Sequence, residues 1–306
     1  MSSIIFGPIN SRRFGKSLGV DLSPSLKQCN FDCLYCELQS AKTVDTYNQI
    51  VPVNEIIIEI KKALEVNKDI DYLTITANGE PTLYPHLKEL ITQINSFKGK
   101  IKTLILTNSS TIDKKEIQDA LNGCNSVKLS LDCISSKCFK KIDRASSNID
   151  IEAIKKGILE FSKTYKGELL IEILFVDGIN DKEEEVKLLN NFLMQINPTR
   201  VDIGTIDRPP AYSVKPISYD KLHKLSLYFD SKLPISIASK HKEINSKYSY
   251  SKEDILETLK RRPLTMQDIN TLFDNKSKNL FNNLLKDGNI IVTKSGNIDF
   301  FKPKDS

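Results

Sequence analysis

Cys29-Asn30-Phe31-Asp32-Cys33-Leu34-Tyr35-Cys36 places three thiols in a C-x3-C-x2-C spacing. Thiols this close in sequence can converge on one metal centre, and cysteine thiolates are the usual ligands of [4Fe–4S] clusters, which normally take four of them. Three local ligands without an evident fourth leave one iron open. An open coordination position is typical of a metal site that does chemistry. The stretch therefore predicts a [4Fe–4S] cluster held by Cys29, Cys33 and Cys36.

A structural zinc site is the alternative for the same three thiols. It would have to borrow a ligand from elsewhere, such as one of the three His residues. Structural zinc sites are normally closed by four ligands, and no Cys or His lies near enough in sequence to be the obvious fourth. The spacing favours the cluster over zinc.

Composition describes an ordinary globular chain. Its 306 residues suffice for one large and one small domain, with 40% hydrophobic and 27% charged residues. The first residues form no signal peptide, and the longest apolar runs, such as 169–176, are strand-sized, so we expect a cytoplasmic protein without membrane spans. Six cysteines do not make a disulfide scaffold, and we expect free thiols in a reducing compartment. A net charge of +5 permits a nucleic-acid or nucleotide substrate without requiring one.

Strand-like and helix-like patterns alternate through most of the chain. Apolar residues recur at helical spacing after each strand, as at Val53, Ile56, Ile57 and Ile60. Six strands separated by helices predict a parallel sheet with crossover helices. The strands are expected at 18–22, 71–77, 102–107, 126–131, 169–176 and 201–206.

Polar residues concentrate where these strands end. The cysteine stretch follows the first strand, and Asn, Asp, Glu or Arg follow each of the others. In α/β folds the loops at the carboxyl ends of the strands converge on one face and form the site. The alternative for any one residue is a turn or a helix cap. The residues concerned are Asn78, Glu80, Asn108, Asp132, Asp177, Asn180, Asp207 and Arg208.

The cysteine spacing, with Tyr35 before the last Cys, resembles the signature of the radical S-adenosylmethionine (SAM) superfamily. The resemblance implies an α/β fold with a partial (βα)6 TIM-type barrel. It also implies that SAM fills the open iron and that an electron from the cluster cleaves it to a 5′-deoxyadenosyl radical. A reductant such as flavodoxin or ferredoxin would supply that electron.

Gly79-Glu80-Pro81 at the end of the second strand resembles the superfamily's GE motif. The resemblance implies that Glu80 binds the SAM amino group, as a carboxylate can through charge-assisted hydrogen bonds. Gly79 would allow close backbone approach. Asn108, Ser130 and Asp132 stand where the family holds the SAM carboxylate and ribose.

Further motifs resemble the wyosine-synthase-related group of radical SAM proteins. They are Phe6-Gly7-Pro8 with Ser11-Arg12-Arg13, Asp177-Gly178-Ile179-Asn180, and the stretch from Thr205 to Pro210. True wyosine synthases modify tRNA and carry further cysteines ahead of the signature, for a second cluster. This chain has no Cys before Cys29. The substrate therefore stays open, with RNA or a nucleotide-like molecule as one choice.

The last part of the chain changes character. We expect a barrel domain over 1–240, a linker over 241–250 and a small domain over 251–306. The small domain has helices predicted at 253–261, 266–273 and 278–286, followed by strands at 290–292 and 298–301 that flank a turn at 295–297. This order resembles a winged-helix domain. The body of its third helix has no basic residue, so a docking role is as compatible with the sequence as nucleic-acid binding.

The sequence thus predicts a radical SAM enzyme. The alternative is an iron–sulfur sensor or regulator, with the winged helix as its output domain. Cys124, Cys133 and Cys138 are expected to be small buried residues, with Cys133 close to the active face because it follows Asp132. A second cluster or a catalytic thiol is the alternative for these three.

Overall fold

The computed structural model describes residues 4–11, 14–237, 249–261, 263–266, 269–270, 273–295 and 298–304. Arg12 and Arg13 of the Ser-Arg-Arg motif lie outside the described residues. So do most of the linker expected at 241–250, parts of the helix expected at 266–273 and two residues of the turn expected at 295–297. No helix in the described ranges is long and apolar enough to cross a membrane.

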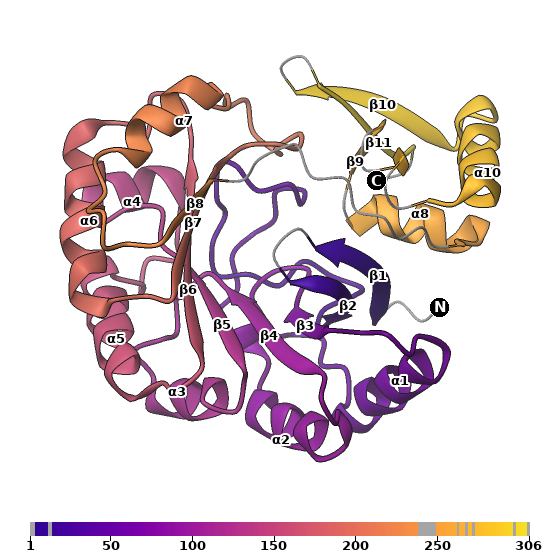
Figure 1. Cartoon of the computed structure of the whole chain (residues 1–306), viewed down its shortest axis with the longest axis horizontal. Coiled ribbons are helices and arrows are strands. Elements are labelled where there is room, and N and C mark those ends of the chain that lie inside the picture. Colours follow the sequence, from indigo (N-terminus) through magenta and orange to yellow (C-terminus); the bar gives the residue numbers. More distant parts are fainter. Residues whose placement is uncertain are drawn as a thin grey trace.

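An eight-stranded sheet organises most of the chain, with its strands in sequence order from β1 to β8 (Figure 1). β1 is antiparallel to β2, and each later neighbour is parallel. The strands are β1 (Ile5–Ser11), β2 (Gly15–Asp21), β3 (Tyr72–Thr76), β4 (Lys102–Thr107), β5 (Ser126–Ser130), β6 (Glu168–Phe175), β7 (Arg200–Thr205) and β8 (Ile235–Ile237). The six predicted strands are confirmed, and the sheet has one more strand at each edge.

Helices follow most of the parallel strands and lie along the outer side of the curved sheet (Figure 1). α1 shows why they form there: Val53, Ile56, Ile57 and Ile60 recur on one helix face, and all four are buried. The short α4 and α7 were missed by the sequence reading. The helices are α1 (Val53–Val66), the 3-10 helix η1 (Pro81–Leu83), α2 (Leu87–Phe97), α3 (Lys115–Leu121), α4 (Ser136–Ile142), α5 (Ile151–Thr164), α6 (Glu183–Ile196) and α7 (Tyr219–Ser226).

The main core lies between the sheet and these helices. Side chains alternate along each strand, so that Val127 and Leu129 of β5 join this core while Ser126, Lys128 and Ser130 point to the other face. A smaller apolar cluster of Tyr72, Leu104 and Leu170 lies on that inner face. The architecture is the α/β partial barrel that the sequence predicts.

The C-terminal segment forms a second, smaller core. It contains α8 (Lys252–Arg261), β9 (Leu264–Thr265), α10 (Asn275–Lys286), β10 (Ile290–Ser295) and β11 (Ile298–Pro303). The three strands make a separate antiparallel sheet in the order β10-β11-β9. Tyr250, expected in the linker, is buried in this core and packs on Phe273 with ring centroids 4.9 Å apart.

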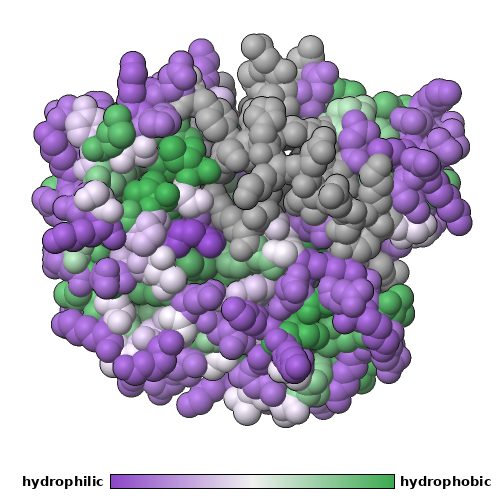
Figure 2. Space-filling model, viewed as in Figure 1, coloured by the Kyte–Doolittle hydropathy of each residue, from purple (hydrophilic) through white to green (hydrophobic). Residues whose placement is uncertain are grey.

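The second core also covers the edge of the main sheet. Ile9 of β1 packs against it, and the Tyr250 hydroxyl donates a 2.8 Å hydrogen bond to the Pro8 carbonyl. The edge is therefore shielded from further strand pairing. In Figure 2, seen from the same side, the rim formed by the outer helices is largely hydrophilic, as expected of amphipathic helices.

One expectation about the cysteines is wrong. Cys133 and Cys138 are joined in a disulfide, whereas the sequence reading expected free thiols. The first turn of α4 brings the two residues together, and a spacing of five residues gave no sign of it. Cys29, Cys33, Cys36 and Cys124 are free. Cys124, Cys133 and Cys138 are all buried, as expected.

Candidate functional site

The cysteine loop leaves the carboxyl end of β2 and is tied to the end of β3 at Gln28. The Gln28 amide donates to the Asn78 carbonyl, and its carbonyl accepts from the Glu80 amide, both at 2.9 Å. Its side chain is fully buried and bonds to Ser23 and to the backbone of Asn48. Gln28 therefore fixes the position of Cys29, the next residue.

Gly79 is required where the two segments meet. Its φ is +137°, and a Cβ at this position would lie 1.9 Å from the Gln28 carbonyl oxygen. A side chain would separate the cysteine loop from the end of β3. The expected close backbone approach at Gly79 is confirmed.

N–H donors lie beside two of the three free thiols of the loop, those of Cys29 and Cys36. The Phe31 amide lies 3.4 Å from the Cys29 sulfur, and the Lys27 ammonium 3.6 Å from the Cys36 sulfur. Asn108 Nδ2 lies 3.7 Å from the Cys29 sulfur. Such donors stabilise sulfur when it carries negative charge, as it does in a metal-bound thiolate.

Burial disfavours the ionised form of the loop thiols. Burial, with a smaller effect from the Glu80 carboxylate, raises the pKa of Cys29 to about 12, and burial also raises the pKa of Cys33 and Cys36. The three sulfurs do not all lie within 4.8 Å of one another. Thiolates on one tetrahedral zinc ion, at about 2.3 Å each, would be closer together than this. The sulfurs are therefore more widely spaced than the ligands of a single zinc ion.

Asp143 is a neighbour of the cysteine loop that the sequence reading missed. The amides of Asp32 and Leu34 donate to the carbonyls of Asp143 and Ile142, and the Cys33 thiol lies 3.6 Å from Asp143 Oδ1. Burial, with the nearby Asp132 charge, raises the pKa of Asp143. Because Asp143 follows α4 and no strand, its position in the sequence gave no signal.

Glu80 is 1% exposed, and protein donors already occupy both of its carboxylate oxygens. Oε1 accepts from the Thr82 amide at 2.9 Å and from the hydroxyls of Thr82 and Thr107, both at 2.6 Å. Oε2 accepts from the Asn108 amide at 2.7 Å. Glu80 thus caps η1, which begins at Pro81, and joins the ends of β3 and β4.

Asn108, Ser130 and Asp132 line one narrow pocket with Tyr35 of the cysteine loop. Asp132 accepts from the Tyr35 hydroxyl and, at 2.7 Å, from the Leu174 amide. Burial raises the pKa of Asp132 to about 7. Three of the predicted site residues are therefore brought together beside the cysteine loop, whereas Gly79, Glu80 and Pro81 do not line this pocket.

Residues 207–212, which we call the cover loop, pack on the cysteine loop. The Ala211 amide donates to the Cys36 carbonyl at 2.8 Å, and Arg208 pairs with Glu37 at 2.6 Å. This explains the polar end of β7 at Arg208. The loop lies over the last part of the cysteine stretch.

Asp32 makes a further contact between the cysteine loop and the cover loop. The Tyr212 hydroxyl donates to Asp32 Oδ2 at 2.6 Å, and Arg144 pairs with the same oxygen at 3.1 Å while stacking on the Tyr212 ring. The other oxygen, Oδ1, is buried and has no hydrogen-bond partner among the described residues. Asp32 therefore depends on these two residues for the stabilisation of its charge.

Other strand-end residues serve the turns, as the alternative interpretation allowed. Asn180 is fully buried, accepts from the Val176 amide and donates to the carbonyls of Asp132 and Leu174. Asp177 is paired with Lys221 at 3.4 Å. Asn180 therefore supports Asp132 from behind, whereas Asp177 takes part in a surface ion pair.

The inner face of the sheet also carries a charged group that the sequence did not predict. The Lys128 ammonium, with its side chain 7% exposed, lies 2.7 Å from Glu172 and 3.1 Å from Asp202. Arg200 pairs with Asp202 at 2.8 Å, and Phe14 lies against both cations. Ser130 is the register partner of Glu172, so this group adjoins the pocket.

Known proteins resemble this chain in sequence and in fold. A family model described as the radical SAM superfamily matches residues 24–189, more than half of the chain. A UPF0026 protein of Helicobacter pylori is 43% identical over 302 residues and covers 97% of both chains. A UPF0026 protein of Methanocaldococcus jannaschii is 30% identical over 304 residues, covering 94% of this chain and 92% of that protein.

Solved structures agree on the fold. Streptococcus suis SuiB bound to S-adenosylmethionine aligns with a TM-score of 0.57 and 19% identity, over 73% of this chain and 50% of that one. A radical SAM methyltransferase of Sphaerobacter thermophilus aligns with the same score and 13% identity, over 72% and 65%. The family match, together with the thiol-bearing loop, places the chain among enzymes that use a [4Fe–4S] cluster, S-adenosylmethionine and a reductant. The chain belongs to the radical SAM superfamily and, within it, to the UPF0026 family.

Proposed function

We propose that Cys29, Cys33 and Cys36 hold the cluster and that the enzyme abstracts a hydrogen atom from its substrate. When both cofactors are bound, they supply a 5′-deoxyadenosyl radical by one-electron cleavage of SAM. The observation that supports this most is the cysteine loop itself. Gln28 fixes its start against Gly79, and N–H donors lie beside the sulfurs of Cys29 and Cys36.

We propose that SAM contacts the pocket beside this loop. Asn108, Ser130 and Asp132 offer an amide, a hydroxyl and a carboxyl group there, which suit the carboxylate and ribose of SAM. Glu80 contributes by holding the backbone N–H of Asn108 through Oε2, while its Oε1 accepts from Thr82 and Thr107. This positioning role is our alternative to the direct ammonium contact that the resemblance implies for Glu80.

Anaerobic reconstitution followed by SAM and dithionite tests the proposal. The wild type should release 5′-deoxyadenosine and bind iron, whereas Cys33→Ala should do neither while keeping its fold by circular dichroism. Cys124→Ala is the matched control, because Cys124 is a free thiol buried in the core away from the loop. Iron loading of Cys33→Ala at the level of the control would refute the assignment.

We propose a polar, RNA-like or nucleotide-like substrate at the inner face of the sheet, as in the wyosine-synthase-related group. The charged group around Lys128 supports a polar partner, and the net charge of +5 suits an anionic one. Identification of RNA or nucleotides that co-purify anaerobically with the protein, and of those altered on SAM turnover, tests this. We also propose flavodoxin or ferredoxin as the reductant.

A domain of winged-helix type is our proposal for residues 249–306. The order α8, β9, α10 and the hairpin β10–β11 supports it, and so does the separate core. Contact between this core and β1 is the observation that favours the second candidate function, an iron–sulfur sensor whose output domain responds to the barrel. Failure to form 5′-deoxyadenosine with a fully loaded cluster would favour the sensor.

A further inference from the structure

The disulfide between Cys133 and Cys138 lies at the carboxyl end of β5, outside the cysteine loop. Its Cα atoms are 5.7 Å apart, a distance that a disulfide spans without moving the backbone. Cys133 is 1% exposed and Cys138 is 7% exposed. Cys133 also lines the pocket that holds Asp132, so the bond adjoins the candidate site.

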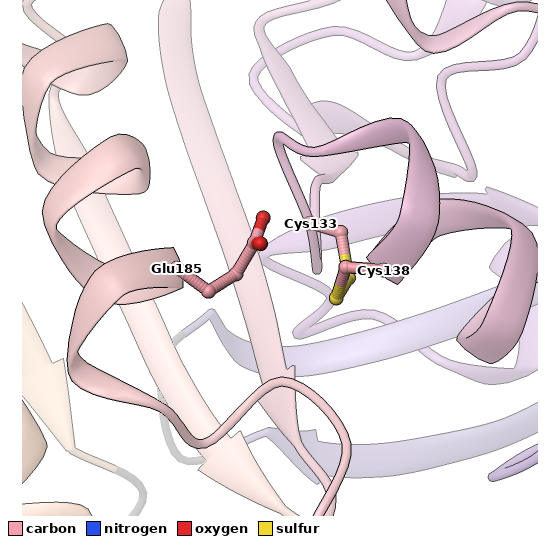
Figure 3. A group of neighbouring side chains, drawn as sticks. All are labelled: Cys133, Cys138 and Glu185. Carbon is pink, nitrogen blue, oxygen red and sulfur yellow. A yellow bond between two sulfur atoms is a disulfide. The ribbon is translucent and has the colours of Figure 1, made fainter.

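Glu185 holds the turn between the two cysteines. In Figure 3 its side chain reaches from α6 toward the disulfide, and a carboxylate oxygen lies within 4.8 Å of both sulfurs. The carboxylate accepts from the amides of Ile134 and Ser135, at 2.5 and 2.8 Å, and from the Ser135 hydroxyl at 2.6 Å. Ser135 in turn accepts from the Cys138 amide and caps α4.

These bonds do not depend on the sulfur–sulfur bond. The turn keeps its acceptor at Glu185 when the disulfide is opened, and the two thiols then stay close together. Thiols held close together have a high effective concentration and bond again readily. A bridge over five residues closes a very short loop, so it restricts the unfolded chain less than a long-range disulfide would. Stabilisation of the fold is therefore a weak reason for this bond.

We propose that Cys133 and Cys138 form a reversible thiol–disulfide site, preorganised by Glu185, that exchanges with dithiol reductants. In the forward direction a reductant thiolate attacks one sulfur, most readily that of the more exposed Cys138, and Cys133 leaves as a thiolate and takes up a proton. The second reductant thiolate then attacks the reductant sulfur of the mixed disulfide, and Cys138 leaves as a thiolate and takes up a proton. The protein gains two electrons and two protons, and the dithiol becomes a cyclic disulfide.

A metal ion is the competing use of the same three residues. Two thiolates and a carboxylate within 4.8 Å could bind zinc. The carboxylate, however, already accepts three protein donors, and both sulfurs are engaged in the bond. The geometry therefore favours the thiol–disulfide site.

Peptide mapping after equilibration with reduced and oxidised dithiothreitol tests the proposal on the full chain. Trypsin cuts after Lys128, Lys137 and Lys140, so fragments 129–137 and 138–140 stay linked only while the disulfide is intact. We expect the linked form to disappear as the reductant fraction rises and to return when it falls. Native mass spectrometry of the reduced protein with added zinc distinguishes metal binding.

Variants at α6 test the role of Glu185. Glu185→Gln and Glu185→Ala should lower the equilibrium constant for bond formation against dithiothreitol, about tenfold or more for Ala. Glu184→Ala is the matched control, because that neighbouring carboxylate is exposed. Should Glu185→Ala fail to fold, Glu185→Gln and the wild-type titration carry the test.

Three results would overturn the proposal. One is a wild-type pair that never links under oxidised dithiothreitol. Another is an equilibrium constant that is the same in the Glu185 variants as in Glu184→Ala. The third is tight zinc binding by the reduced protein that Cys138→Ser abolishes. None depends on SAM or cluster chemistry, so failure here is distinct from failure of the proposed function.

Discussion

Glu80→Gln separates two roles for the most buried carboxylate of the site. If Glu80 contacts the SAM ammonium, losing its charge weakens SAM binding and leaves the fold almost unchanged. If it holds the ends of β3 and β4 together, the same change destabilises the fold. The contacts of the Glu80 side chain favour the second outcome.

The magnitude follows from those contacts. A Gln oxygen at the Oε1 position keeps the three donors from Thr82 and Thr107. Its NH2 group then faces the Asn108 amide, a donor opposite a donor. The change loses one hydrogen bond to a charged acceptor, about 1.5–3 kcal/mol, and leaves a buried N–H without a partner, about 1–3 kcal/mol. Burial raises the pKa of Glu80, so removing its charge offsets part of this loss.

We therefore expect Glu80→Gln to lower the free energy of unfolding by roughly 2–4 kcal/mol. For a chain of this size, that corresponds to a drop in Tm of roughly 3–8 °C. Chemical denaturation of the cluster-free protein measures the first quantity. Glu89→Gln is the control, because Glu89 is an exposed carboxylate on α2.

SAM binding decides between the roles. In the folded, reconstituted variant we expect the SAM Kd to rise less than about fivefold, since the pocket residues are unchanged. Anaerobic titration, followed by the change in the EPR signal of the reduced cluster, measures it. A Kd at least about tenfold higher, the loss of one charge-assisted bond, with unchanged stability would refute the positioning role.

Three further predictions concern Tyr212 of the cover loop, Asp132 of the pocket and the C-terminal core. Tyr212→Phe removes the hydroxyl that bonds Asp32 Oδ2. Iron loss from the reconstituted protein to a chelator should then be severalfold faster than in the control Tyr228→Phe, whose hydroxyl bonds Glu183 instead. Equal rates would show that the cover loop does not shield the cluster. The pKa of Asp132 is raised to about 7 in the folded chain, so between its unfolded pKa and 7 the native state binds one more proton than the unfolded state. The cluster-free wild type should therefore lose stability relative to Asp132→Asn as pH rises from about 4 to 8. A stability difference between the two proteins that stays constant across this pH range would contradict the prediction. Deleting residues 249–306 should leave a folded barrel that still cleaves SAM, although Ile9 becomes exposed. Insoluble protein or loss of the cluster would show that the two cores are not independent.

Local patterns were enough to predict the sheet, its outer helices and the cysteine loop. The six strands and the helical repeat at Val53 to Ile60 are periodic over windows short enough to be read directly. The sequence also indicated that Gly79 allows close backbone approach, and the structure shows that the approaching segment is Gln28. β1 and β8 were missed, since one contains Gly7 and Pro8 and the other has only three residues.

Contacts between distant segments were decided by the tertiary structure alone. The role of Glu80 depends on donors from Thr82, Thr107 and Asn108, and that of Asp32 on Arg144 and Tyr212, up to 180 positions away. The disulfide of Cys133 depends on a turn that Glu185 holds from another helix. A sequence shows which groups are available, but the partner of a buried charge or thiol is set by how the elements pack.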